Sequence, residues 1–285
     1  MSGDTVRARL AAGESVVMPG VWDALSARIA AEAGFSTVFV SGYAVSGSLL
    51  GLPDIGYLGQ TEMADVARRI SLGAPGLDVV VDADTGYGNA LSTARTVELW
   101  RQAGASGIFL EDQVWPKRCG HMAGKQVVPR DEWLSKLRAA CDRREGLHVT
   151  ARTDARAVHG IDEALERGRM ARDLGVDAVF VEAPESIDEL ARIGTELRGV
   201  TLVANMVETG KTPLLSSAEL AELGFRLIVS PPSLLFAGVR AMRDSAAALA
   251  PEGTMRDHLD TLVSFDDFTR LVDLDGHRAR EDRYS

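Results

Sequence analysis

Short apolar runs recur along the chain, and stretches with the periodicity of amphipathic helices separate them. Eight of these runs are brief and mostly apolar, which is typical of buried parallel strands. They lie at residues 15–18, 37–40, 79–81, 107–110, 148–151, 178–181, 201–204 and 226–229. The clearest helical stretches between them are at about 24–33, 61–71, 92–102 and 131–144, and Ser92 is the expected N-cap of the third of these.

Eight strands that alternate with helices predict a closed (β/α)8 barrel, and a length of 285 residues fits one. A doubly wound open sheet is the alternative that the same pattern allows. No linker divides the chain, so residues 1–285 are predicted to form a single barrel domain. Helical stretches at about 234–249 and 264–272 predict a C-terminal helical extension over about 233–285. Its Arg-rich tail, 278–285, is expected to fray or to lie against a partner subunit.

Composition and charge narrow the class of protein. The net charge of -10 argues against nucleic acid or an anionic membrane surface as a partner, but local cations still allow a small anionic substrate. No apolar run is long enough to span a bilayer, and the N-terminus lacks the features of a signal peptide. Two cysteines suggest no disulfide framework. We therefore expect a cytoplasmic protein.

Polar side chains follow most of the predicted strands at the point where each strand ends. Active sites of barrels lie at the carboxyl ends of the strands, so these side chains are expected to converge on one rim. Capping of helices accounts for one or two of them, but hardly for all seven. The set is Ser41, Asp82, Asp84, Glu111, Arg152, Glu182 and Asn205.

Three of these side chains are acids that suit a metal ion. Asp82 and Asp84 stand two residues apart on a strand, so they share a face, and Glu111 ends the next strand. Acids packed together raise one another's pKa, and a divalent cation with oxygen ligands, such as Mg²⁺, removes that conflict. The alternative is that one acid caps the next helix and another is solvated. Asp54, in the long loop 43–59, is either a further ligand or substrate contact or an ordinary turn residue.

The loop after the fourth strand contains the sequence Lys117-Arg118-Cys119-Gly120-His121. A cysteine among three potential cations is expected to have a lowered pKa and to exchange a proton near neutral pH. The alternative is a basic surface loop with an incidental cysteine. Zinc is not expected, because no second cysteine or histidine falls at ligand spacing.

Other residues of the predicted rim suit an anionic substrate. Arg152 offers a fork of N–H donors for a carboxylate. Ser41, Gly42 and Tyr43 offer a hydroxyl group and backbone N–H groups to the same ligand. Glu182 is expected either to order the water shell of the metal or to bind substrate.

Several segments occur in an order that resembles the isocitrate lyase/phosphoenolpyruvate mutase superfamily over about residues 17–232. They are 41–42, 51–54, 82–88, 111–113, 116–121, 151–154 and 205–208. The resemblance implies a (β/α)8 barrel whose last helix is swapped between subunits. It also implies a Mg²⁺ site, which Mn²⁺ can fill, and a homotetramer made of two helix-swapped dimers.

The resemblance also implies a role for each matching position. Asp82 and Asp84 hold the metal directly or through water, with Glu111 behind them. Cys119 acts as the general acid on a mobile loop. Three further residues match catalytic positions, namely Lys117, His121 and Asp54. The residues that match substrate-binding positions are Ser41, Gly42, Tyr43, Gly120, Arg152, Glu182 and Asn205.

The activity implied is Mg²⁺-dependent cleavage of a C–C bond in a 2-hydroxy or 2-oxo dicarboxylate, such as a substituted malate or a methylisocitrate-like acid. The products are an α-oxo acid and a carboxylate. Phe236 stands where methylisocitrate lyases carry an arginine for an extra carboxylate, so a smaller or more apolar acid is expected. The alternatives are a mutase that makes or breaks P–C bonds, an oxaloacetate decarboxylase, and a non-enzymatic binding module, against which the intact acids and cysteine argue.

Overall fold

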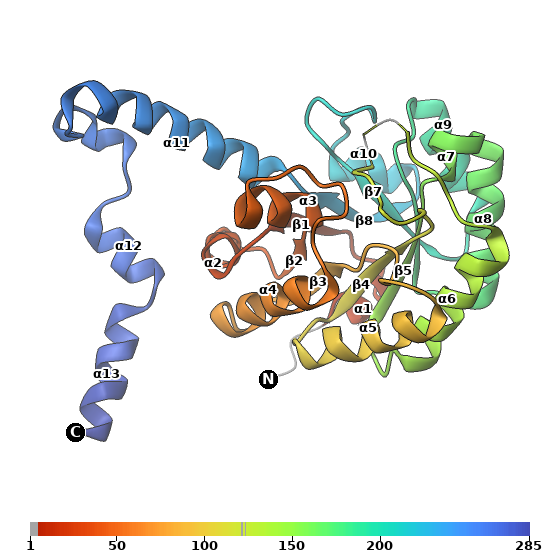
Figure 1. The fold of residues 1–285 in the computed structure, drawn as a ribbon, viewed down its shortest axis with the longest axis horizontal. Helices are drawn as coiled ribbons and strands as arrows, with labels where there is room; N and C mark the ends of the chain where they lie inside the picture. Colours follow the sequence, from red (N-terminus) through yellow and green to blue (C-terminus); the bar gives the residue numbers. More distant parts are fainter. Residues whose placement is uncertain (1–4, 121, 123) are drawn as a thin grey trace.

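The barrel predicted from the sequence is present and closed. The computed structural model describes residues 5–120, 122 and 124–285. All eight strands are parallel, each pairs with the next, and β8 pairs with β1, which excludes an open sheet (Figure 1). The strands are β1 Val16–Val21, β2 Thr37–Val40, β3 Asp78–Asp82, β4 Gly107–Glu111, β5 His148–Thr153, β6 Ala178–Val181, β7 Thr201–Asn205 and β8 Phe225–Ser230.

Helices surround this barrel and continue beyond it. Around the barrel lie α1 Val6–Ala11, α2 Ala24–Glu32, α3 Gly42–Val45, the π-helix η1 Ser46–Leu50, α4 Gln60–Gly73, α5 Ala90–Gln102, α6 Arg130–Arg143, α7 Ala155–His159, α8 Ile161–Leu174, α9 Ile187–Glu196 and α10 Ser217–Glu222. Beyond β8 follow α11 Ser233–Glu252, the 3₁₀ helix η2 Arg256–Thr261, α12 Phe265–Leu271 and α13 Leu274–Tyr284.

Three local predictions differ from the structure. The stretch read as a loop after β2 contains α3 and η1. α5 is capped by Asn89 rather than Ser92, because the Asn89 side chain accepts the backbone N–H groups of Leu91 and Ser92. The Arg-rich tail is helical rather than frayed, since it forms most of α13.

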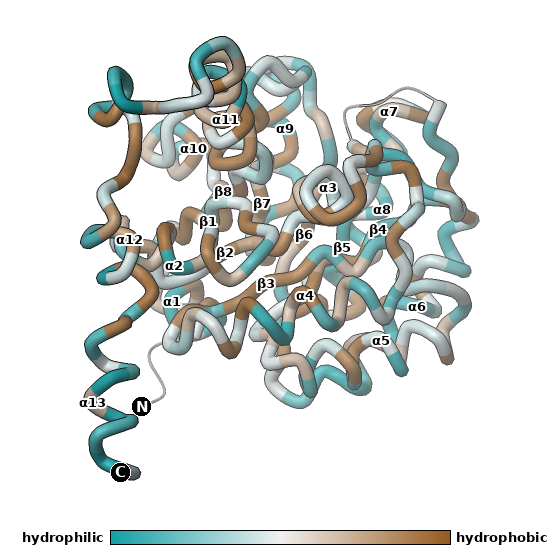
Figure 2. The backbone as a smooth tube through the Cα atoms, turned by 60° about the vertical axis from the view of Figure 1, so that its left-hand side comes forward, coloured by the Kyte–Doolittle hydropathy of each residue, from teal (hydrophilic) through white to brown (hydrophobic). Residues whose placement is uncertain are grey.

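The apolar core has two layers that position the site. The strands that contribute to both layers are largely brown, and so hydrophobic, in Figure 2. One layer lies between the strands and the outer helices, and the other fills the barrel interior. Phe39, Phe109 and Phe180 lie in the interior layer, with ring centroids 4.9 Å apart for the first pair and 5.8 Å for the second. The same three residues line the cavity at the carboxyl ends of the strands, so they form its apolar floor.

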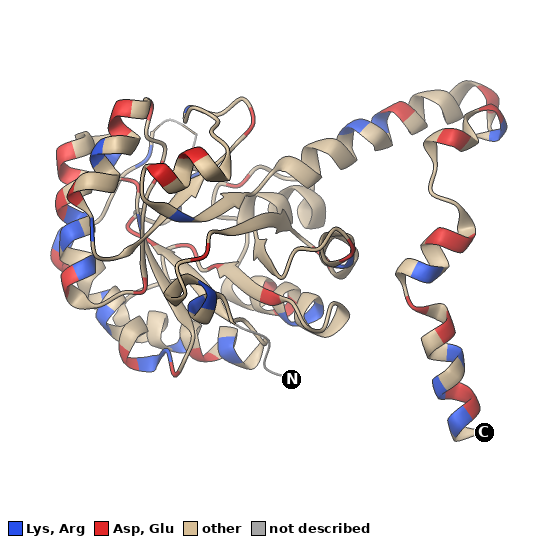
Figure 3. Cartoon of the chain, turned by 180° about the vertical axis from the view of Figure 1, so that it is seen from behind, with Lys and Arg blue, Asp and Glu red and all other residues tan. Residues whose placement is uncertain are grey.

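The last helices form an arm that leaves the barrel (Figure 1). α11 extends outward from β8, and α12 returns to α2, where Arg28 donates a hydrogen bond to the Leu271 carbonyl over 3.1 Å. Charged residues lie along the arm and over the outer helices (Figure 3). The arm also exposes large apolar side chains, with Val263 66% and Phe265 81% exposed. Among the described residues, no helix has both the length and the apolar character needed to cross a lipid bilayer.

The amino ends of the strands bury a histidine. His148 begins β5 beside Asp177, which pairs with Arg7 over 2.8 Å and with Arg144 over 3.3 Å. Burial lowers the pKa of His148 to about 4; Asp177 opposes this shift, and Arg7 and Arg144 add to it. The folded chain therefore holds this imidazole in its neutral form.

The histidine makes stability depend on pH. An unfolded histidine has a pKa of about 6.5, so the neutral buried ring contributes fully above that pH and loses its contribution as pH falls toward 4. Both proteins should become less stable between pH 7 and pH 4. We predict that the unfolding free energy of His148→Gln falls by about 2–3 kcal/mol less than that of the natural chain. Urea unfolding at both pH values measures this. Equal losses in the two proteins would contradict it.

Candidate active site

The carboxyl ends of the strands surround a cavity of about 270 Å³. Most of the predicted rim residues line it, together with residues of the loops after β2 and β4. The predicted residues on its wall are Ser41, Tyr43, Asp54, Asp82, Lys117, Cys119, Gly120, Arg152, Glu182 and Asn205. Asp84 and Glu111 are buried beside this cavity rather than on its wall. His121 lies outside the described residues.

A buried lysine holds the acids of β3 and the β2 loop together. Lys117 Nζ lies 2.7 Å from Asp54 and 2.8 Å from Asp84 Oδ1. The Asp82 side chain accepts the backbone N–H of Asp84 over 3.1 Å. The sequence allowed two interpretations of Asp54, a site residue or an ordinary turn residue. The structure places it in this ion-pair cluster.

Burial shifts the pKa values of these acids more than the neighbouring cations do. Burial raises the pKa of Asp84 to about 6, and Asp82 and Asp54 add to this, whereas Lys117 opposes it. Burial also raises the pKa of Glu111 well above its ordinary range, although Arg152 opposes the shift. Burial lowers the pKa of Lys117, but Asp84 and Asp54 outweigh that effect and raise it overall.

The same acids fit a divalent cation. Both carboxylate oxygens of Glu111 are buried without a hydrogen bond, and its nearest charged partner is Arg152 Nε at 3.4 Å. Among the described residues, no three acid, histidine or cysteine side chains form a metal cage by themselves. Mg²⁺ needs no such cage, because it keeps several waters and uses one or two carboxylates plus substrate oxygens. Asp82, which faces the cavity, and Asp84 beside it are the residues that would hold it.

The cysteine lies on the cavity wall, in a segment attached at several points. The backbone N–H of Cys119 donates to the Asp54 carbonyl over 3.2 Å. Gln113 brackets the preceding residue, because its side chain donates to the Arg118 carbonyl and accepts the Arg118 N–H. This half-buried thiol therefore faces the same space as the acids and the arginine.

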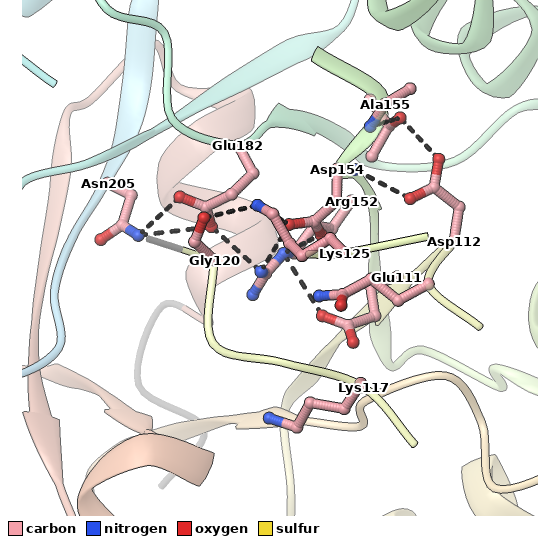
Figure 4. A network of polar contacts seen from close by, with 12 residues as sticks. Glu111, Asp112, Lys117, Gly120, Lys125, Arg152, Asp154, Ala155, Glu182 and Asn205 are labelled. Carbon is pink, nitrogen blue, oxygen red and sulfur yellow. Dashed lines mark hydrogen bonds and ion pairs between the residues drawn. The ribbon is translucent and has the colours of Figure 1, made fainter. Parts of the chain in front are cut away.

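Arg152 is the centre of a second charge cluster (Figure 4). Its guanidinium donates to Asp154 over 2.9 Å and 3.1 Å, and it lies 3.3 Å from Glu182. Asn205 donates in turn to Glu182 over 3.3 Å. The guanidinium is thus held at the end of β5 by Asp154 and Glu182, and the arginine lines the cavity, where its positive charge favours an anionic ligand.

The remaining predicted contacts come from the loop after β2. The Ser41 hydroxyl accepts the Ala44 N–H and caps α3, so this serine has a structural use as well. Gly42 lies close to the acids, because a Cβ there would stand 3.1 Å from Asp82 Oδ2. The Tyr43 ring meets the Phe236 ring edge-on, with centroids 6.2 Å apart. Phe236 also lines the cavity, so one of its walls is aromatic.

The sequence analysis missed two buried residues and one partly buried residue around this site. Lys125 and Asp154 pair over 2.7 Å beside Arg152, and Tyr87 donates its hydroxyl to Asp84 over 3.1 Å. Asp154 and Tyr87 lie in the segments 151–154 and 82–88 that carry the family resemblance, but neither was given a role. Nothing in the sequence marked Lys125 as a buried residue of the site, because a lysine in an irregular loop normally points into solvent.

Comparison with known proteins agrees with this geometry. The family model described as phosphoenolpyruvate phosphomutase matches residues 6–250. The chain belongs to the PEP mutase/isocitrate lyase superfamily. It is 48% identical over 275 residues to the chloroplastic carboxyvinyl-carboxyphosphonate phosphorylmutase of Arabidopsis thaliana, covering 95% of this chain and 81% of that protein. It is 43% identical over 282 residues to the 2,3-dimethylmalate lyase of Eubacterium barkeri, covering 98% and 97%.

Solved structures of the superfamily share the fold over nearly the whole chain. A crystal structure of 2,3-dimethylmalate lyase has a TM-score of 0.92 and 36% identity, covering 99% of this chain and 96% of that one. Phosphonopyruvate hydrolase in complex with oxalate and Mg²⁺ has a TM-score of 0.87 and 29% identity, covering 98% and 97%. The chain is thus an enzyme of a superfamily that contains both lyases and mutases.

The ion pairs of Lys117 give a prediction for this superfamily member. Removal of one partner from a buried ion pair costs about 3–5 kcal/mol. We expect Lys117→Met in EDTA at pH 8 to lose an unfolding free energy of that order. The loss should shrink at pH 5.5, because Asp84, whose pKa burial raises to about 6, takes up a proton there.

Urea unfolding followed by circular dichroism measures both values. Lys211→Met is the matched control, because Lys211 is 45% exposed and lies 3.6 Å from Glu185 at the surface. Surface pairs of that kind contribute about 1 kcal/mol or less. A Lys117→Met protein as stable as the natural chain at pH 8 would show that Lys117 does not offset the acids.

Proposed function

We propose that this enzyme is a divalent-metal-dependent lyase that cleaves the C2–C3 bond of a 2-hydroxy dicarboxylate with an apolar substituent, such as an alkylmalate. The products are a 2-oxo acid and a carboxylate. The observation that carries the proposal is that acids, a thiol, an arginine and the aromatic rings of Tyr43 and Phe236 line one cavity. The 2,3-dimethylmalate lyase that resembles this chain is a named example of such an activity.

The charges of the cavity suit a dicarboxylate better than a tricarboxylate. Of the described residues on its wall, only Lys117 and Arg152 are cationic. Phe236 and Tyr43 occupy the wall where a third carboxylate would need another cation. An alkyl group fits against these rings without losing hydrogen bonds, whereas a carboxylate there would be desolvated without a partner.

Different residues would bind the metal, bind the substrate and transfer the protons. A divalent ion held by Asp82 and Asp84 would polarise the carboxylate and hydroxyl oxygens of the substrate. Arg152 binds a substrate carboxylate, and one of the buried acids accepts the hydroxyl proton as the C2–O bond becomes a carbonyl. The C2–C3 electron pair stays on the departing carboxylate fragment, and Cys119 delivers a proton to C3. The hydroxyl proton balances the one that the thiol gives up.

A phosphonate mutase is the second candidate, because the phosphorylmutase of Arabidopsis thaliana is 48% identical to this chain. The same cation and arginine would hold a phosphonate as readily as a carboxylate. The aromatic wall beside Phe236 favours the lyase, because a phosphonate brings more charge and no alkyl group to cover it.

The lyase proposal predicts release of a 2-oxo acid. We expect the enzyme with Mg²⁺ to release it from alkylmalates faster than from methylisocitrate or oxaloacetate, as measured with a coupled dehydrogenase. EDTA should abolish release, and Mg²⁺ or Mn²⁺ should restore it. Cys119→Ser should lower turnover by about 10²–10⁴-fold, the usual contribution of a general acid.

Cys141→Ser is the matched control and should keep full activity, since Cys141 lies on α6 away from the cavity. If no 2-oxo acid forms from any substrate in the panel, the lyase proposal fails. Phosphorus NMR with phosphonopyruvate then tests the mutase. Full turnover in Cys119→Ser would remove the thiol as the acid.

We also propose that the arm joins copies of the chain into a homotetramer built from helix-swapped dimers. The exposed apolar side chains of the arm support this, because patches of that kind rarely remain in contact with water. We expect Val263→Asp combined with Phe265→Asp to reduce the mass measured by light scattering. Arg278→Ala, on the charged helix α13, is the control that should leave the mass unchanged. A natural chain that is already monomeric would contradict the proposal.

A further inference from the structure

Lys125 lies on the segment that follows the cysteine, and its side chain reaches inward to the arginine cluster (Figure 4). Its ammonium group donates one hydrogen bond to the carbonyl oxygen of Gly120 and another to Asp154 Oδ1, 2.7 Å away. Only 2% of the side chain is exposed. A charge buried this deeply is tolerated only where its partners are fixed, since loss of either partner leaves it poorly solvated.

The acid at one end of this contact also anchors the substrate-binding arginine. Asp154 accepts two hydrogen bonds from Arg152, and its own backbone N–H donates to Asp112 over 2.8 Å. Burial alone raises the pKa of Asp154, but Arg152 and Lys125 outweigh it and hold that pKa below its ordinary value. One carboxylate therefore fixes Lys125 and Arg152 relative to each other.

The carbonyl at the other end belongs to the residue directly after the cysteine. Gly120 rests against the arginine cluster, because a Cβ there would stand 2.4 Å from the Glu182 carboxyl carbon and 2.8 Å from Arg152 Nη2. The Gly120 carbonyl belongs to the peptide unit that follows Gly120, so the bond from Lys125 fixes the chain one residue beyond the cysteine. On the other side of the thiol, the Cys119 N–H is held by Asp54.

We propose that Lys125 is a positioning residue that fixes the Cys119 thiol relative to Arg152, acting through Gly120 and Asp154 and without touching substrate. The catalytic meaning of this contact rests on the proposed function, in which the thiol supplies a proton. The positioning itself is a property of the chain without substrate, so it is measurable even if the reaction differs.

The direct test is alkylation of the two cysteines by iodoacetamide, with the modified peptides counted by mass spectrometry. Cys119 is half-buried in the natural chain, and loss of its support increases access by local opening. We expect Lys125→Met to raise the Cys119 alkylation rate at least fivefold. Rates are taken at the plateau above the thiol pKa, so that a change in ionisation does not imitate a change in access.

Matched controls separate positioning from unfolding. Cys141 in the same molecules is the internal reference, and its rate should not change. Gln126→Ala alters the exposed neighbour of Lys125 and should leave the Cys119 rate within twofold of the natural value. Lys125→Arg retains donors for both partners and should recover part of the protection. If Lys125→Met does not fold, Lys125→Gln is measured in the same way, because it removes the charge in a smaller polar side chain.

A Cys119 rate within twofold of the natural value in the folded variant would overturn the proposal. Turnover of an alkylmalate is the second readout, where Lys125→Met should lower kcat about tenfold or more and keep KM within threefold. A loss confined to KM would also overturn it. If the natural enzyme turns over no substrate in the panel, the proposed function fails, and the alkylation rates alone decide the role of Lys125.

Discussion

The site depends on one constraint, which is that it buries more carboxylates than the neighbouring cations can neutralise. Lys117 bridges the acids of β3 and the β2 loop, and Arg152 bridges those of β4, β5 and β6. Both cations are themselves buried, so their positions are fixed by pairing rather than by solvent. Burial raises the pKa of Asp84 and of Glu111 although Lys117 and Arg152 oppose the shifts, so the two cations do not offset the cost of burying these carboxylates.

The closed barrel makes this arrangement possible. Parallel strands end at one rim, so side chains that are distant in sequence face the same space. The aromatic layer below them fills the barrel interior, so these side chains stay at the rim. The same layer gives the cavity an apolar floor, and Phe236, contributed by the arm, adds an aromatic wall. The cavity therefore combines an apolar surface with the charged groups at the strand ends.

Much of the fold and part of the site could be predicted from the sequence. Strand periodicity is a local property, and all eight strands were located within a few residues. Asp82 and Arg152 were found because strand ends point to a known rim. Asn89 was missed as a cap because Ser92 is also a good cap, and only the path of the chain decides between them. Lys125 was missed because its partner Asp154 lies 29 residues further along the chain, and no spacing in the sequence encodes that contact. Tyr87 was missed although its partner Asp84 is close in sequence, because the spacing alone does not show where the ring of Tyr87 points.

The cysteine illustrates why such partners matter. Its position in a loop gives it no support from strand or helix hydrogen bonds, so every constraint on the thiol must come from neighbouring groups. Asp54 holds its N–H, and Lys125 holds the carbonyl of the next residue. Asp54 also pairs with Lys117, and Lys125 shares Asp154 with Arg152. The groups that hold the backbone on either side of the thiol therefore belong to the two charge clusters, Asp54 to that of Lys117 and Lys125 to that of Arg152.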